Sequence, residues 1–127
     1  MSGKGIVLDT NSVIHLVDGR YPKAALAHLE DNAVHLSFVT EIEVRSYAGH
    51  NAAHIAIAME FLTQSNIHGI SEVIKDEAVR LRRTYKLKTP DAIIAATAVV
   101  KRMPLMTGDK GLSRLASEIE LVFMNHP

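Results

Sequence analysis

Short apolar runs alternate with helix-like segments along the chain, and few folds accommodate that order. The first run, GIVL at residues 5–8, is rich in β-branched residues and is followed by an acid, as expected of a fully buried strand. Further strands are predicted within AVHLSFV, NIHGI, PLMT and ELVFM. Strands that alternate with helices predict an α/β fold in which helices cover both faces of a parallel sheet.

The segments between these runs carry helix signals. Helices are predicted over 12–17, across YPKAALAHLEDN, from Thr40 to Tyr47 with Gly49 at the end, over 52–63, over 71–86, from Thr89 onward, and across KGLSRLA. In the 71–86 segment, one apolar face at helical spacing is predicted to comprise Ile70, Ile74, Ala78, Leu81 and Tyr85. Thr89 is the predicted N-cap of the next helix, and Pro90 suits its first position.

Composition limits the class of protein. The 127 residues suffice for one core, so residues 1–127 are predicted to form a single domain. The absence of cysteine excludes disulfides, thiolate metal sites and cysteine nucleophiles, and favours a cytoplasmic protein. No apolar run approaches the roughly 18 residues of a membrane span, and MSGKGIVLD does not resemble a signal peptide. Fourteen basic residues balance fourteen acidic ones, so net charge alone does not indicate a nucleic-acid binder.

Four acids fall at predicted junctions between strands and helices. Asp9 follows the first strand, and Glu43 lies in the first turn of the helix after the second strand. Asp91 lies in the first turn of the helix that leads into PLMT, and Asp109 follows that strand. All four are predicted to reach the carboxyl edge of the sheet, where ligand sites of open α/β folds form. Because clustered carboxylates repel unless a cation binds, the pattern predicts a Mg²⁺ or Mn²⁺ site that hydrolyses a phosphodiester.

Each acid also has a purely structural interpretation. Asp9 can cap the following helix, Asp91 can complement the helix dipole, and Asp109 can be an ordinary turn residue. Glu43 can complete a capping box within TEIE. Glu41 competes with Glu43 for the site, but residues two apart on a helix point about 200° apart, so only one can face it. We expect Glu43 to be that residue.

Four segments, IVLDTNSVI, LSFVTEIEV, TPDAIIAATA and LMTGDKGL, resemble in this order the PIN domain, and more narrowly the VapC-type toxin ribonucleases of toxin–antitoxin pairs. The resemblance spans residues 5–124 and implies a three-layer α/β/α fold with a five-stranded parallel sheet in the order 3-2-1-4-5. It also implies a Mg²⁺- or Mn²⁺-dependent endoribonuclease that hydrolyses single-stranded RNA with a metal-activated water. The matching motifs imply catalytic and metal-binding roles for Asp9, Glu43, Asp91 and Asp109, with Asn11 and Thr107 as supporting polar residues. Gly108 departs from the family pattern, which often has a bulkier polar residue there.

Two further segments point to partners. Arg80, Arg82, Arg83, Lys86 and Lys88 form a basic segment that is either a solvated helix face or a set of phosphate contacts along an RNA strand. The helix over 52–62 is apolar on almost every side, which indicates either burial within the domain or a protein interface. The resemblance favours the interface, because this region contributes to homodimer and antitoxin contacts in the family.

Two other functions fit parts of the sequence. A phosphatase of the haloacid dehalogenase type would use Asp9 as a covalent nucleophile, but that class usually has Asp-x-Asp after its first strand, and position 11 is asparagine. A PIN fold that has lost catalysis would be a binding module, yet such proteins typically lose one or more of the acids that this chain retains. A metal-dependent RNA cleavage assay separates both from the ribonuclease.

Overall fold

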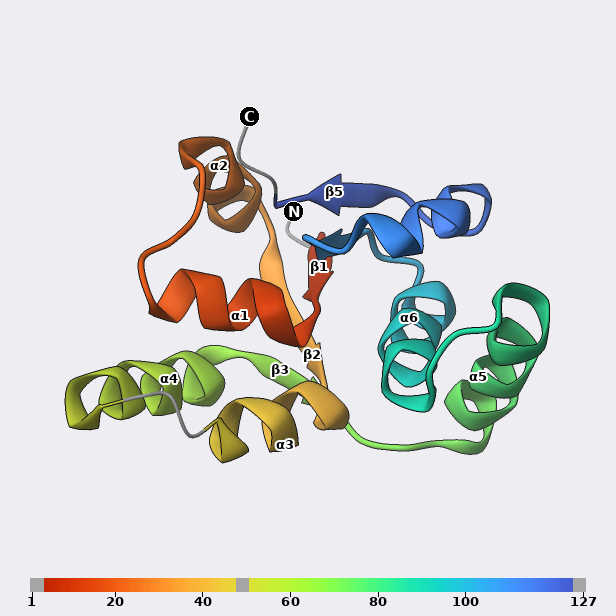
Figure 1. The fold of residues 1–127 in the computed structure, drawn as a ribbon, viewed down its shortest axis with the longest axis horizontal. Helices are drawn as coiled ribbons and strands as arrows, with labels where there is room; N and C mark the ends of the chain where they lie inside the picture. The colour runs from red at the N-terminus through yellow and green to blue at the C-terminus, as the bar shows by residue number, and fades with distance from the viewer. Residues whose placement is uncertain (1–3, 48–50, 125–127) are drawn as a thin grey trace.

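The computed structural model describes residues 4–47 and 51–124, and a five-stranded parallel sheet lies at its centre (Figure 1). The strands are β1 (Gly5–Leu8), β2 (Ala33–Ser37), β3 (Asn66–His68), β4 (Leu105–Thr107) and β5 (Leu121–Phe123). They lie side by side in the order β3-β2-β1-β4-β5, and each neighbouring pair is parallel. The predicted fold class and strand order are confirmed.

Helices cover both faces of this sheet. They are α1 (Thr10–Val17), α2 (Lys23–Asp31), α3 (Phe38–Ser46), α4 (Ala52–Gln64), α5 (Glu72–Tyr85), α6 (Thr89–Lys101) and the 3₁₀ helix η1 (Lys110–Ser117). In Figure 1, α1, α3 and α4 lie on one side of the sheet, and α5 and α6 lie on the other. Within the described ranges, no helix combines the length and the apolar character needed to cross a membrane.

The central strand β1 shows how the layers are separated. All four of its residues are buried. Val7 packs with α5, α6 and η1, whereas Ile6 and Leu8 pack with α1, α3 and α4. Successive side chains of a strand point to opposite faces, so this short run contributes to two cores at once. On the α6 side, small residues such as Ala92 and Ala95 are fully buried, and they allow the helix to lie close to the sheet.

Helix α3 begins earlier than predicted and is capped by a different residue. β2 ends at Ser37, whose hydroxyl oxygen accepts a hydrogen bond from the Val39 N–H at 3.1 Å. The prediction that Thr40 caps this helix is therefore wrong, and Thr40 is fully buried inside it. Ser37 is an equally good cap three residues earlier, and the β-forming character of Phe38 and Val39 obscured the boundary. The predicted helix end at Gly49 lies outside the described residues.

Two details around α5 and α6 also differ from the predictions. The Ala92 N–H donates to the Lys88 carbonyl at 2.9 Å, which makes Lys88 the N-cap of α6 in place of the predicted Thr89. Pro90 occupies the first turn, as predicted. Ile70 precedes α5 and is exposed, so the buried face of that helix begins at Ile74.

A pair of histidines joins the edge strand β3 to β2. The His35 Nδ1 and His68 Nε2 atoms are 2.8 Å apart, and the two rings are inclined by 15°. Burial lowers the pKa of both imidazoles, and the charge of Lys101 lowers them further; His68 adds to the effect on His35. The native fold therefore favours the neutral form of this pair.

Candidate active site

A cavity of about 320 Å³ opens beyond the carboxyl ends of β1 and β4, since Asp9 directly follows β1 and Asp109 lies two residues after β4. It is lined by Asp9, Thr10, Asn11, Ile14, Glu43, Tyr47, Asp91, Ile94 and Asp109. The four acids singled out in the sequence thus line one cavity. Two larger hollows, of about 440 and 550 Å³, open around Lys4 and Met103 at the opposite edge of the sheet, and none of the four acids lines them.

Two of these acids are also helix caps. The Asp9 Oδ1 atom accepts a hydrogen bond from the Ser12 N–H at 2.9 Å, so Asp9 is the N-cap of α1. The Asp109 Oδ1 atom accepts one from the Gly111 N–H at 2.8 Å at the start of η1. For both residues the structural interpretation is confirmed, and their metal-binding role stays a prediction. Capping uses one oxygen and fixes the side chain, while the residue still lines the cavity.

Thr107 does not line the cavity. It is fully buried, and its hydroxyl oxygen accepts a hydrogen bond from the Asp109 N–H at 3.0 Å. Gly111 also serves this turn, because a Cβ there would lie 2.9 Å from the Asp109 Oδ1 atom. Both residues therefore help to fix the position of Asp109.

Glu43 and Glu41 lie in different environments. Glu43 lines the cavity, and its Oε1 atom accepts a hydrogen bond of 2.5 Å from the Thr10 hydroxyl. Glu41 instead forms an ion pair with Arg45 one helical turn away, at 3.8 Å. Thr10 was not among the predicted site residues, although its place directly after Asp9 was a usable signal.

Asp91 experiences the charges of the other three acids. Its pKa is raised, first by burial and then by the negative charges of Asp109, Asp9 and Glu43, while Lys88 opposes the shift. An Asp at the amino end of a helix is normally stabilised by the helix dipole. The upward direction of the pKa therefore shows that crowding of like charge and loss of solvent prevail at this position.

The chemistry of these side chains fits a hard divalent cation. Carboxylate oxygens are the ligands that Mg²⁺ and Mn²⁺ prefer, and a bound cation relieves the repulsion felt by Asp91. Within residues 4–47 and 51–124, no group of three or more Asp, Glu, His or Cys side chains is already arranged to hold a metal ion. The four carboxylates thus share a cavity without forming a finished set of ligands.

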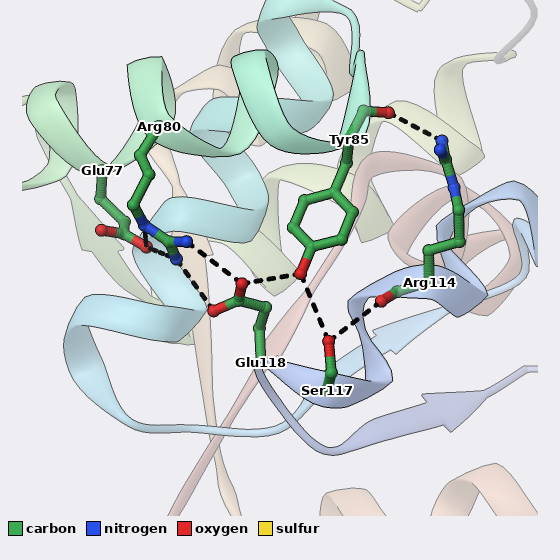
Figure 2. Close-up of polar contacts among 6 residues, drawn as sticks. All are labelled: Glu77, Arg80, Tyr85, Arg114, Ser117 and Glu118. Atoms are coloured by element: carbon green, nitrogen blue, oxygen red, sulfur yellow. Dashed lines mark hydrogen bonds and ion pairs between the residues drawn. The ribbon is translucent and has the colours of Figure 1, made fainter.

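Two residues of the basic segment are engaged by other groups of the protein. Arg80 is held by ion pairs with Glu77 and, at 2.8 Å, with Glu118 (Figure 2). The Arg82 Nε–H donates to the Leu87 carbonyl at 3.0 Å. The remaining basic residues are also exposed; they are Arg83, Lys86 and Lys88. Lys88 is close enough to Asp91 to affect the pKa of that carboxyl group.

The network around Glu118 fastens α5 to η1 (Figure 2). Glu118 accepts hydrogen bonds from Arg80 and, at 2.7 Å, from the Tyr85 hydroxyl, and these bonds lower its pKa. Arg114 donates to the backbone carbonyl of Tyr85 at 2.7 Å. Because Asp109 is the N-cap of η1 and α6 follows α5 in the chain, the network lies between the segments that lead to Asp109 and Asp91.

The apolar helix α4 exposes much of its hydrophobic surface. Ile55, Ile57 and Met59 are 49%, 50% and 43% exposed, whereas Ala58 and Leu62 are buried. The interpretation of this helix as one buried on every side is therefore wrong. Ile55 and Met59 also line a small hollow of about 90 Å³ between α4 and α3.

Comparison with known proteins agrees with this architecture. A model of the PIN domain matches residues 6–118. One chain of a toxin–antitoxin complex from Klebsiella pneumoniae is 32% identical, with a TM-score of 0.78, over 97% of this chain and 100% of that one. A chain of FitAcB from Neisseria gonorrhoeae is 26% identical, with a TM-score of 0.66, over 91% and 95% of the two chains.

A chain of VapBC2 from Rickettsia felis, bound to a DNA fragment from their promoter, shares the fold at 17% identity and a TM-score of 0.77, over 94% of this chain and 98% of that chain. A comparison with curated protein sequences gave no significant match. The family model covers most of the chain, and the chain therefore belongs to the PIN-domain family.

Proposed function

We propose that the chain is a metal-dependent endoribonuclease and the toxin of a toxin–antitoxin pair. One observation carries the proposal: four carboxylates from four different segments line one cavity, and three of them raise the pKa of the fourth. Membership of the PIN-domain family and similarity to chains of toxin–antitoxin complexes support it. A ribonuclease that acts on cellular RNA would work in the cytoplasm.

In this proposal Asp9, Glu43, Asp91 and Asp109 hold Mg²⁺ or Mn²⁺. The cation would supply Lewis acidity and lower the pKa of a water molecule at the scissile phosphodiester. The protein contributes fixed ligands: the helix-capping bonds of Asp9 and Asp109 restrict those two side chains. The exposed amide of Asn11 lies at the rim, where it can donate to a phosphate oxygen.

The cavity lining also includes two apolar residues. They are the buried residues Ile14 and Ile94. We infer that single-stranded RNA approaches past Lys88, with Lys86 and Arg83 as further phosphate contacts. Arg80 and Arg82 contribute less in this scheme, because both are engaged within the protein.

The test is cleavage of a single-stranded RNA by the purified protein. Cleavage is expected with Mg²⁺ or Mn²⁺, to stop with EDTA, and to be lost in Asp9→Asn. The matched control is Asp76→Asn, which removes an exposed acid of α5 outside the cavity. RNA binding without cleavage would instead indicate a noncatalytic module. Hydrolysis of a small phosphate monoester without RNA cleavage would indicate a phosphatase.

The partners proposed are an antitoxin and a second copy of the chain. The exposed apolar side chains of α4 motivate this, since exposed apolar patches mark protein interfaces. Replacing Ile57 by Glu is expected to weaken assembly more than folding. The control is Leu26→Glu, on α2. Sedimentation of wild type and variants at micromolar concentration measures the effect, and a monomeric wild type would contradict the homodimer.

A further inference from the structure

The hydroxyl of Thr10 joins two of the segments that line the cavity. Thr10 is the first residue of α1, directly after Asp9, and Glu43 lies in the second turn of α3. Their side chains meet at 2.5 Å between the Thr10 Oγ1 and Glu43 Oε1 atoms. Behind them the Thr40 Oγ1 atom lies 3.4 Å from the Thr10 Oγ1 atom.

The direction of these hydrogen bonds follows from the groups themselves. An ionised carboxylate can only accept, so the single hydroxyl proton of Thr10 points to Glu43. At the longer contact the Thr10 Oγ1 atom also lies as a donor toward the Thr40 Oγ1 atom, but at 3.4 Å this is much the weaker of the two arrangements. Thr40 is fully buried and lies three residues before Glu43, on the same side of α3. The hydrogen bond that reaches the carboxylate therefore comes from Thr10, and Thr40 is its buried neighbour.

The Glu43 side chain needs a hydrogen-bond partner to hold one orientation. Glu43 is exposed and has three rotatable side-chain bonds, and it is not a cap of its helix. Asp9 and Asp109 each accept a hydrogen bond from a backbone N–H, whereas the Glu43 carboxylate accepts one from the Thr10 hydroxyl. The bond engages the Oε1 atom, and a carboxylate has a second oxygen that can bind a cation.

We propose that Thr10 is a positioning residue: its hydroxyl holds Glu43 in the orientation in which the carboxylate serves as a ligand. The proposal rests on the function proposed above. It assigns to Thr10 no contact with RNA or with the reacting atoms. Groups that orient metal ligands typically change metal affinity about 10- to 100-fold when they are removed.

The decisive comparison is between Thr10→Val and Thr10→Ser. Valine keeps the branched shape without the hydroxyl, and serine keeps the hydroxyl without the methyl group. Titration of the metal-free protein with Mn²⁺ should show affinity weakened about tenfold in Thr10→Val and close to wild type in Thr10→Ser. Thr97→Val is the matched control, because that hydroxyl donates to the Ile93 carbonyl within α6, away from the cavity.

A second measurement does not depend on metal or on RNA. Side-chain coupling constants from NMR report whether Glu43 occupies one rotamer in the metal-free protein. One rotamer is expected in wild type and in Thr10→Ser, and averaging is expected in Thr10→Val. A Glu43 that is equally ordered in Thr10→Val overturns the proposal, as does a Thr10→Ser variant that behaves like Thr10→Val. If wild type shows the ordered rotamer but binds no Mn²⁺, the proposed function fails and the positioning bond stands.

Discussion

Replacing Asp91 by Asn should stabilise the metal-free protein. The raised pKa of Asp91 shows that the fold disfavours its negative charge, through burial and through Asp109, Asp9 and Glu43. Asparagine has nearly the same shape and no charge, and its oxygen can still accept hydrogen bonds. The variant therefore removes the unfavourable charge interactions while keeping the packing at the start of α6.

The size of the effect follows from the cavity. A sphere of 320 Å³ is about 8 Å across, and two unit charges at that separation repel by about 0.5 kcal/mol at the dielectric constant of water. Three neighbours give about 1.5 kcal/mol, which physiological salt and the favourable helix dipole reduce to about 0.5–1 kcal/mol. For a domain of this size, that corresponds to a melting temperature higher by roughly 2–4 °C.

Thermal unfolding of wild type and Asp91→Asn in EDTA measures this difference. It should shrink as salt is raised, and also as pH falls toward the ordinary aspartate pKa of about 4, because Asp91 then becomes neutral in wild type. Excess Mg²⁺ should reverse the order, since a ligand at 100 times its Kd stabilises the native state by about 2.7 kcal/mol. An Asp91→Asn variant less stable than wild type in EDTA would refute the reasoning.

Three further outcomes are expected. Glu43→Gln should abolish RNA cleavage with an unchanged circular dichroism spectrum, whereas Glu41→Gln should cleave normally; the reverse result would reassign the site. Tyr85→Phe should lower the free energy of unfolding by about 1–2 kcal/mol in urea titrations, because a hydrogen bond to a carboxylate is lost. Because the native pKa values of His35 and His68 are lowered, stability should be full above pH 6.5 and decline as pH falls below it; replacing both by Gln should flatten that decline.

The sequence predicted those parts of the fold that follow from the pattern of apolar and polar residues. Buried runs such as GIVL and the alternation of strands with helices indicated a parallel sheet, and the resemblance implied its strand order. Helix boundaries were less predictable, because several residue types cap equally well. Ser37 and Thr40 are both good caps, and only the tertiary structure shows that Thr40 lies in the core.

The four acids of the candidate site were predicted from the sequence, whereas the residue that hydrogen-bonds to one of them was missed. Asp9, Glu43, Asp91 and Asp109 could be found because charged residues stand out at the ends of apolar runs. The role of Thr10 depends on an approach between α1 and α3 that spacing along the chain does not reveal. The partners of Arg80 likewise include Glu118, which lies 38 residues away in sequence.

The transition from β2 to α3 contains no connecting residue, because Ser37 ends the strand and also caps the helix. Glu43 follows six residues later on the same rigid unit. Each residue of an α-helix turns the chain by about 100°, so a single insertion between Ser37 and Glu43 would point the carboxylate away from the cavity. The β2–α3 junction is therefore a segment in which length matters as much as residue identity. Substitutions such as Phe38→Leu leave the carboxylate in place, whereas one added or deleted codon would remove it from the site.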